Sequence, residues 1–567
     1  MQVSNLKRNS NYPQNQQNLK NNSNKKNDTQ KFGGALDYAS LGLRFLDTNQ
    51  AWGATAVDLG SMVIPRTLVD FQRGPDAGIE TARRESSSSI NHACVGVYGA
   101  LAGLLLASGF NSKFGVKFNN IFAGDKILEN LGQSWHNEVH AGNKQPLRKH
   151  LEKVVGSIEG FNPSKSKEGW VGIPKDTQKL IVDRLENDIN SKEGMKITKE
   201  TELYVHSLIT STTGAESKIR LKGAKEHVTG LDLKTVLENV YSVTKSFTSE
   251  KVGKVFAETK DFSANSYIKS MKRFNTARSL MGVGIAGAIG MSIQPINRYL
   301  TKKKTGEDKF VGGGEKDNSA GFFARKAIAG TAFMAGTFAT ISTKPKEILP
   351  KIQFRGMIPS LNQFKAIYGM TILSRFLSAR NDNELTESAI KDTAGFLNWL
   401  ILGNVVSKAV ANKLDKDLIN LKDGEGKGFM NWLKDSSIKT RDEVLLSSLN
   451  KSGVQTTKDG KALSYLELLK KIPEADKATK VKLAKLNIAQ VAGYLYSGVV
   501  LGYGIPKLNT YLTNRREAKK AQELANKTQQ SNVNIQQNQG TQEVQGVQPN
   551  EFKFAMKQNN EFWKKAS

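Results

Sequence analysis

Three stretches of the chain are long, apolar and free of charge, and they constrain the fold more than any other feature. Residues 86–112, 279–297 and 487–506 contain no Asp, Glu, Lys or Arg. A helix that crosses the hydrocarbon core of a bilayer needs about 20 mainly apolar residues. Each run meets or approaches that length and is rich in glycine. The sequence therefore predicts three membrane-spanning helices.

Two further apolar runs, residues 327–343 and 393–407, are slightly short of a full span. Tilt, local thinning of the bilayer or lysines that reach the headgroups could make up the difference. The alternative is that both are buried helices of a water-soluble domain. Residues 52–71 and 361–377 are apolar but carry internal charges, which is typical of amphipathic or interfacial helices. We therefore expect an all-α, polytopic membrane protein with Gly/Ala-rich spans.

The polar segments between the apolar runs show helical periodicity almost throughout and little strand-like alternation. They predict helical insertions outside the bilayer. The N-terminal segment is rich in Asn, Gln and Lys and has no apolar core or cleavage-site pattern, so we expect no cleavable signal peptide. The predicted organisation is 1–34 disordered, 35–112 an amphipathic helix plus the first span, 113–278 a helical insertion, 279–410 membrane helices, 411–485 a second helical insertion, 486–518 the last span with a basic exit, and 519–567 a disordered Gln/Asn-rich tail.

Two segments that follow apolar runs resemble each other. "QPINRYLTKKK" (294–304) and "PKLNTYLTNRR" (506–516) share Asn-x-Tyr-Leu-Thr followed by basic residues. A tyrosine at headgroup depth followed by cations is typical of a membrane exit. The two segments could have arisen by duplication or independently. If both exits lie on the same side of the membrane, an even number of crossings must separate them. The predicted headgroup contacts are Arg73, Arg83, Arg84, Tyr299, Lys302, Lys303, Tyr511, Arg515 and Arg516.

Charged residues precede the first apolar run at helical spacing. In a helix over residues 51–71, Asp58, Arg66 and Asp70 share one face, and Pro65 would kink or restart the helix. One interpretation places these charges where the chain passes from the headgroups into hydrocarbon. The other places Asp58 and Arg66 inside the protein at membrane depth, where ionisable groups are costly and often functional, as a proton or ion site.

Small residues four apart within the apolar runs predict close helix packing. Such spacing lets helix backbones approach each other in lipid, either inside one bundle or between copies in a homo-oligomer. The alternative is that these positions share no interface. The pairs are Gly99 and Gly103, Gly282 and Ala286, and Ala332 and Gly336.

No motif in the chain indicates catalysis. His136 and His140 lie one helical turn apart, a spacing that can bind zinc, but Asn137 stands where a metalloprotease helix has Glu, and a third ligand is not evident. Structural or surface histidines are the alternative interpretation. The chain has no nucleophile elbow, no phosphate-binding loop and no Cys–His pair. We therefore expect no enzyme activity, no cofactor and no metal.

The charge balance indicates the kind of partner. The chain has 82 Lys and Arg against 53 Asp and Glu, a formal charge of +29, which favours anionic lipid; nucleic-acid binding is not expected because no recognition motif is present. We expect a multi-pass protein of a cell membrane, of the bacterial inner-membrane type, with an interaction or scaffolding role. The alternatives are a transporter or channel built on the partial repeat, and an insertion-competent pore-forming or ejection-type protein.

Overall fold

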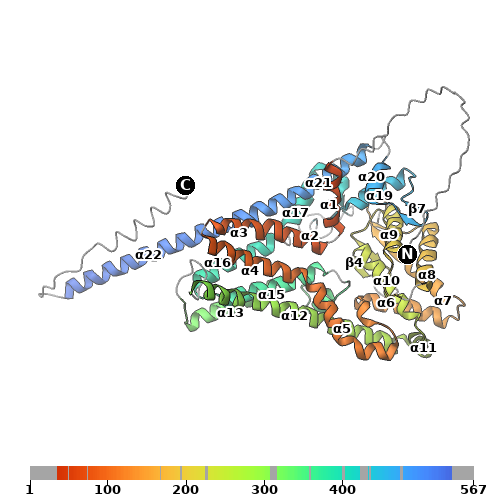
Figure 1. The fold of residues 1–567 in the computed structure, drawn as a ribbon, viewed down its shortest axis with the longest axis horizontal. Coiled ribbons are helices and arrows are strands. Elements are labelled where there is room, and N and C mark those ends of the chain that lie inside the picture. The colour runs from red at the N-terminus through yellow and green to blue at the C-terminus, as the bar shows by residue number, and fades with distance from the viewer. Residues whose placement is uncertain are drawn as a thin grey trace, which may run out of the picture.

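The structure is a computed structural model and is mostly helical, with a few short strands, which confirms the all-α prediction. It divides into an elongated helical bundle and a rounded lobe at one end of that bundle (Figure 1). The structure describes residues 35–48, 50–72, 74–166, 168–191, 194–223, 228–306, 316–356, 359–398, 402–421, 432, 436–472 and 477–538. The predicted disordered segment 1–34 lies outside these residues.

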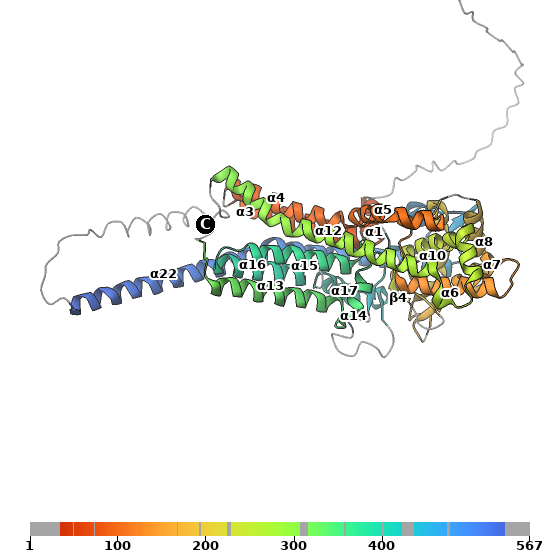
Figure 2. The same cartoon turned by 90° about the horizontal axis from the view of Figure 1, so that it is seen from below.

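The bundle is formed by helices that run back and forth along its long axis. In Figure 2, α4, α5 and α12 lie in one layer, and α13, α15 and α16 lie in a second layer beside it. The bundle helices are α1 (Ala35–Thr48), α2 (Gln50–Val57), η1 (Asp58–Val63), α3 (Ile64–Phe71), α4 (Pro75–Ala93), α5 (Val95–Phe114), α12 (Ser266–Thr305), α13 (Ala320–Ile341), α14 (Pro345–Ile352), α15 (Leu361–Ser378), α16 (Asp382–Leu397), α17 (Gly403–Leu414), α21 (Lys477–Ser497), η6 (Gly498–Gly504) and α22 (Ile505–Asn538).

Three helices are long and apolar enough to cross a membrane, judged by length and composition: Val95–Phe114, Ser266–Thr305 and the continuous helix Ala478–Thr528. The first differs from its predicted bounds, because the run 86–112 is broken at Cys94 between α4 and α5. The polar half of the run belongs to α4 and faces inward. Ser89 donates to Asp58, and the side chain of Asn91 donates to the carbonyl of Ala286. The polar half of the run thus forms hydrogen bonds inside the protein as part of α4, whereas the apolar half forms α5.

Residues 361–377, expected to form an amphipathic or interfacial helix, form α15. It is packed between α12 and α13, and its buried side chains include Phe364, Ile367, Ile372 and Phe376. Because neighbours cover it on several sides, α15 has no free polar face to present to headgroups.

The π-helical segments η1 and η6 interrupt the bundle helices, and each leads directly into an Ile-Pro pair. η1 precedes Pro65 and η6 precedes Pro506. Proline lacks the N–H of a regular helix and its ring clashes with the carbonyl four residues earlier; a wider π turn can absorb that misfit. The two segments touch, and a Cβ on Gly502 would overlap the ring of Pro65 and lie 3.0 Å from the carbonyl oxygen of Ser61. The predicted helix over 51–71 and its restart at Pro65 are therefore both present.

The lobe combines the two polar insertions. The first contributes α6 (Asp125–His140), α7 (Pro146–Gly156), α8 (Lys175–Ser191), α9 (Lys199–Thr213), α10 (Leu233–Phe247), α11 (Glu250–Glu258) and strands β1 (Ile158–Phe161), β2 (Trp170–Gly172), β3 (Ile219–Leu221) and β4 (Val228–Leu231). These strands form an antiparallel sheet in the order β2-β1-β3-β4, with Glu159 opposite both Gly172 and Arg220. The sequence did not predict this sheet, because strands of three or four residues are too short to show alternation.

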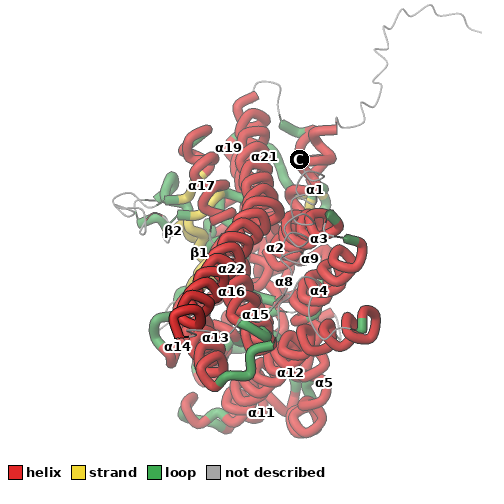
Figure 3. The backbone as a smooth tube through the Cα atoms, turned by 90° about the vertical axis from the view of Figure 1, so that its left-hand side faces the viewer, coloured by secondary structure: helices red, strands yellow, loops and turns green. Residues whose placement is uncertain are grey.

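The second insertion contributes η5 (Lys416–Leu418), α19 (Arg441–Lys451), α20 (Tyr465–Lys470) and the strand pairs β5 (Ile419–Asn420) with β6 (Ser437–Ile438) and β7 (Thr457–Lys458) with β8 (Lys461–Ala462). α19 packs against α9 of the first insertion, so the two insertions form one lobe. Viewed along the bundle in Figure 3, β1 and β2 of the lobe lie to one side of the bundle helices.

The first part of the predicted disordered tail, 519–567, is helical. α22 continues as a helix to Asn538, past residue 519, and extends beyond the bundle end opposite the lobe (Figure 1). Residues 515–530 are rich in Arg, Lys, Glu, Gln and Ala, which are strong helix formers, so intrinsic propensity accounts for the extension. The remainder of the predicted tail, 539–567, lies outside the described residues.

Candidate functional site

Charged side chains from several helices meet inside the bundle. Arg66 of α3, Glu85 of α4, Arg375 of α15 and Asp392 of α16 are all buried, and together with Asp58 at the start of η1 they form what we call the buried charge network. Arg66 is only 1% exposed. Removing ions from water costs several kcal/mol each unless partners compensate. The positions of the partners therefore decide what such a network can do.

Glu85 is the centre of the network. Its carboxylate lies 3.4 Å from Nη1 of Arg66, 3.2 Å from Nη2 of Arg375, 3.4 Å from Arg84 and 3.9 Å from Lys391. Helices that are distant in sequence are thus joined through one acidic side chain. Arg375 uses its other nitrogen, Nη1, to donate to Asp392 at 2.6 Å.

Asp58 and Arg66, which were expected to share a helix face, are both buried and bind different partners. Ser89 Oγ donates to Asp58 at 2.5 Å, and Nδ1 of His92 lies 3.9 Å from the same carboxylate. Arg66 reaches Glu85 and also donates from Nε to the carbonyl oxygen of Leu501 at 3.3 Å. Leu501 belongs to η6, so the guanidinium connects the buried charge network to a π-helical turn.

Asp70 lies at the edge of the network, because its charge acts on Lys391, which is 3.9 Å from Glu85. Asp70 is half-buried and accepts a 2.5 Å hydrogen bond from Thr81, which fastens the end of α3 to the start of α4. The structure therefore brings two of the three predicted residues, Asp58 and Arg66, into one buried cluster and places the third at the helical hairpin.

Sequence reasoning missed Glu85, Arg375 and Asp392. Each left a signal: Glu85 directly precedes the first apolar run, Arg375 lies inside the run 361–377, and Asp392 directly precedes the run 393–407. Single charges of opposite sign at such positions could have been matched as mutual partners, because an unpaired charge there would be costly. Tertiary packing decides which charges form pairs, and this pairing cannot be inferred from the sequence.

The predicted headgroup residues divide into two groups. Arg83 donates to Asn297 at 2.7 Å and to Thr301 at 2.9 Å, so it fastens α4 to the end of α12, and Arg84 pairs with Glu85. Arg73 lies outside the described residues. The remaining positions are exposed or partly exposed near the basic exits: Tyr299, Lys302, Lys303, Tyr511, Arg515 and Arg516.

Two of the three predicted small-residue pairs lie at a helix contact. A Cβ on Gly282 would lie 2.9 Å from Cα of Gly99, so α5 and α12 touch backbone to backbone there. Gly103 lies against the side chain of Arg278, and Ala286 is fully buried. Ala332 and Gly336 instead face outward on α13, and nothing lies within 4 Å of a Cβ placed on Gly336.

A second small-residue contact was not predicted. On α17, Gly403 lies against Ser497 of α21, and Ser407 lies against Gly493. Both pairs of residues are spaced by four, and the reversed order of the contacts shows that the two helices are antiparallel. Any larger side chain at Gly403 or Gly493 would overlap the opposing serine.

The histidine pair predicted as a metal candidate forms a local contact. The rings of His136 and His140 lie 4.1 Å apart, and Nδ1 of His140 is 3.0 Å from the carbonyl oxygen of His136. Among the described residues, a group with metal-ligand spacing lies elsewhere, where ligand atoms of His206, Glu216 and Asp442 are within 4.8 Å of one another.

The geometry at that second group does not favour a metal. Both oxygens of Asp442 accept hydrogen bonds from Arg44 at 2.6 Å, which places a guanidinium where a cation would have to approach. His206 Nε2 lies 2.9 Å from Glu216, whose other oxygen accepts from Thr440. We call these five side chains, together with Glu443, the lobe clasp, because they join α1, α9 and α19.

Comparison with known proteins adds no assignment, since no family model, no curated protein and no solved structure matches the chain.

Proposed function

We propose that this chain is an integral, multi-pass membrane protein of interaction or scaffolding type, whose bundle is embedded in lipid and whose lobe binds a partner at the membrane surface. The observation that carries the proposal is the polarity of the bundle. Several charged side chains lie inside, in the buried charge network beside an apolar core, while many large apolar side chains lie on the outer faces. Outward apolar faces suit a hydrocarbon surrounding, and buried charges are typical of functional or structural pairs at membrane depth.

The outward apolar residues are numerous and occur on helices from the whole bundle. A soluble monomer rarely exposes a contiguous apolar patch larger than a few hundred Å². The exposed residues include Val97, Leu101, Leu104 and Leu105 on α5, Leu280, Ile289 and Ile296 on α12, Phe323 and Ile328 on α13, Ile488, Val491 and Leu495 on α21, and Val499 and Tyr503 on η6. Burial of these faces in acyl chains would remove them from water.

The lobe has the opposite polarity. Its core is apolar, with Leu128, Val155, Ile181, Val240 and Phe256 fully buried. Both insertions emerge at the same end of the bundle (Figure 1), so they meet as one domain on one side of a membrane. A compact domain held at a surface in this way suits partner binding. The exposed basic residues of the two exits, at the opposite end, suit anionic headgroups.

Extraction of cell membranes with alkaline carbonate tests the proposal. We expect the full chain to stay in the pellet and to enter solution only with detergent. Protease added to sealed vesicles of known orientation should cut both insertions from the same side. Recovery of monodisperse protein without detergent would overturn membrane embedding and would favour an insertion-competent protein that is first made in soluble form.

A transporter or channel is the second candidate, and the contact between Arg66 and the η6 carbonyl of Leu501 favours it. π-helical turns occur often at functional sites, and here two of them touch beside buried charges. Ion or proton flux through vesicles reconstituted with purified protein tests this candidate. A flux that disappears in Asp58→Asn would support transport, whereas flux no greater than in empty vesicles would leave the scaffolding role.

A further inference from the structure

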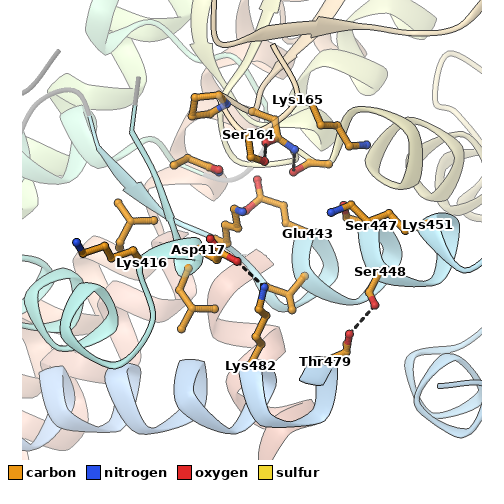
Figure 4. Close-up of a pocket in the computed structure, with 18 of the residues that line it drawn as sticks. Ser164, Lys165, Lys416, Asp417, Glu443, Ser447, Ser448, Lys451, Thr479 and Lys482 are labelled. Atoms are coloured by element: carbon orange, nitrogen blue, oxygen red, sulfur yellow. Dashed lines mark hydrogen bonds and ion pairs between the residues drawn. The ribbon is translucent and has the colours of Figure 1, made fainter. Parts of the chain in front are cut away.

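The lobe contains a cavity between its two insertions, lined by several lysines. The cavity has a volume of about 550 Å³, which lies within the range of small-molecule sites. Figure 4 shows Lys165 above the cavity, Lys416 and Asp417 to one side, Lys451 on α19 to the other, and Lys482 on α21 below. The cavity is therefore lined by residues from both insertions and from the bundle helix α21.

The charges around this cavity do not balance. Five lysines line it, against Asp417 and Glu443. Lys482 pairs with Asp417 at 2.7 Å, so these two charges cancel. The oxygens of Glu443 already accept the backbone N–H groups of Glu216 at 2.7 Å and Thr440 at 2.6 Å. The cationic charge of the other lysines therefore has no equivalent acidic counterpart in the wall.

Four lysines remain: Lys165, Lys416, Lys439 and Lys451. Among the residues that the structure describes, none of the four forms an ion pair with a carboxylate. Burial lowers the pKa of Lys165, and the neighbouring Lys451 and Lys439 lower it further. Burial also lowers the pKa of Lys439, although the charges of Glu443 and Asp417 act to raise it; Lys482 and Lys451 lower it further. The charges of Lys165, Lys439 and Lys451 therefore act on one another around the cavity.

A buried amide in the same wall has unused hydrogen-bonding capacity. Asn420 on β5 is 1% exposed, and within the described part of the chain neither its side-chain nitrogen nor its oxygen has a hydrogen-bond partner. Burying an amide without hydrogen-bond partners is unfavourable. A ligand with oxygen acceptors and a hydroxyl or water donor would satisfy both atoms.

We propose that this cavity binds an anionic ligand that carries a phosphate group, held by Lys439 and Lys451 with Lys165 and Lys416 around it. Phosphate suits four cations because it carries up to two negative charges and several acceptor oxygens. The site lies at the start of α21, where Lys482 precedes the apolar run 487–506 by five residues. A free phosphorylated molecule and a phosphorylated lipid headgroup therefore share the required chemistry and can both reach it.

Binding of two probes to the purified full-length protein tests the site. Inorganic pyrophosphate is titrated by calorimetry for the soluble source, and vesicles with phosphatidic acid are compared with vesicles of phosphatidylcholine for the lipid source. We expect at least one probe to bind, and Lys439→Gln/Lys451→Gln to weaken that binding by roughly tenfold or more, because the variant removes two of the four cations around the cavity.

The matched control is Lys458→Gln/Lys461→Gln, which removes the same charge from the exposed β7–β8 hairpin outside the cavity. The control should bind as the wild type does, and both variants should melt at the wild-type temperature. Equal weakening in both variants, or no binding of either probe, would overturn the site. Because the assay concerns the lobe alone, it can succeed whether or not carbonate extraction supports membrane embedding.

Discussion

Arg375 donates a 2.6 Å hydrogen bond from Nη1 to Oδ1 of Asp392, and both side chains are buried. The same guanidinium reaches Glu85 with Nη2. One side chain of α15 thereby fixes α16 and α4 together. This geometry predicts which substitutions the bundle should tolerate.

Arg375→Met should destabilise the protein by about 3–5 kcal/mol, because it leaves the carboxylate of Asp392 buried without its partner. The double variant Arg375→Met/Asp392→Leu removes both charges and should cost much less than the sum of the single variants. Thermal unfolding of all four proteins in detergent gives the coupling energy. Additive losses would contradict the pairing.

A charge placed on the outer face of α5 should report on the solvent around it. Leu105 is 73% exposed in the middle of that helix. In lipid, Leu105→Lys should cost about 2.5–3.5 kcal/mol and reduce the amount of protein recovered in membranes. Leu180→Lys, at an exposed position on α8 of the lobe, should stay within about 0.5 kcal/mol of wild type. If both variants behave alike, the outer face of α5 lies in water.

The antiparallel contact of α17 and α21 should not tolerate a methyl group at its glycines. In Gly493→Ala the new Cβ would overlap the hydroxyl of Ser407, and we expect a loss of about 1–3 kcal/mol. Gly336→Ala is the matched control, because it faces open space in α13 and should gain about 0.5–1 kcal/mol from helix propensity. Melting temperatures should therefore shift in opposite directions.

The lobe clasp should make the stability of the lobe depend on pH. Burial lowers the pKa of His206, but the charge of Glu216 and its hydrogen bond outweigh burial and raise that pKa above 6.5. Burial and the nearby Glu216 raise the pKa of Glu443 to about 7. Both groups hold a proton more tightly in the folded state than in the unfolded state. Their contribution to stability is therefore present in full at low pH and is lost as the pH rises through the folded pKa values.

We accordingly expect the lobe to melt at a higher temperature at pH 5.5 than at pH 8. The variant His206→Gln/Glu443→Gln should have a flatter pH dependence, because neither replacement titrates. Calorimetry in detergent across this range measures the difference. A slope identical to that of the wild type would show that the clasp does not control the pH response.

The sequence predicted the helical class and the apolar runs that lie in α12 and in α21–η6, because hydropathy and helical spacing are local signals. It left open whether Asp58 and Arg66 lie inside the protein or near the headgroups. It did not predict the break at Cys94, and it gave no sign of the tertiary hydrogen bonds that Ser89 and Asn91 make just before that break. The partners Glu85 and Arg375 were missed for a similar reason: 290 residues separate them, and only packing brings them together. The charged cavity was missed because its lysines look like ordinary surface residues in the sequence.

The joining of the two insertions has a consequence for biosynthesis. Residues 113–278 and 411–485 are made at different times, yet α9 and α19 pack against each other. In the proposed membrane-embedded state both insertions must lie on one face of the bilayer, so the chain from α12 to α17 must cross that bilayer an even number of times. A nascent chain that skipped one pass would strand its halves in separate compartments. The lobe would thus assemble only in chains that have crossed the bilayer an even number of times.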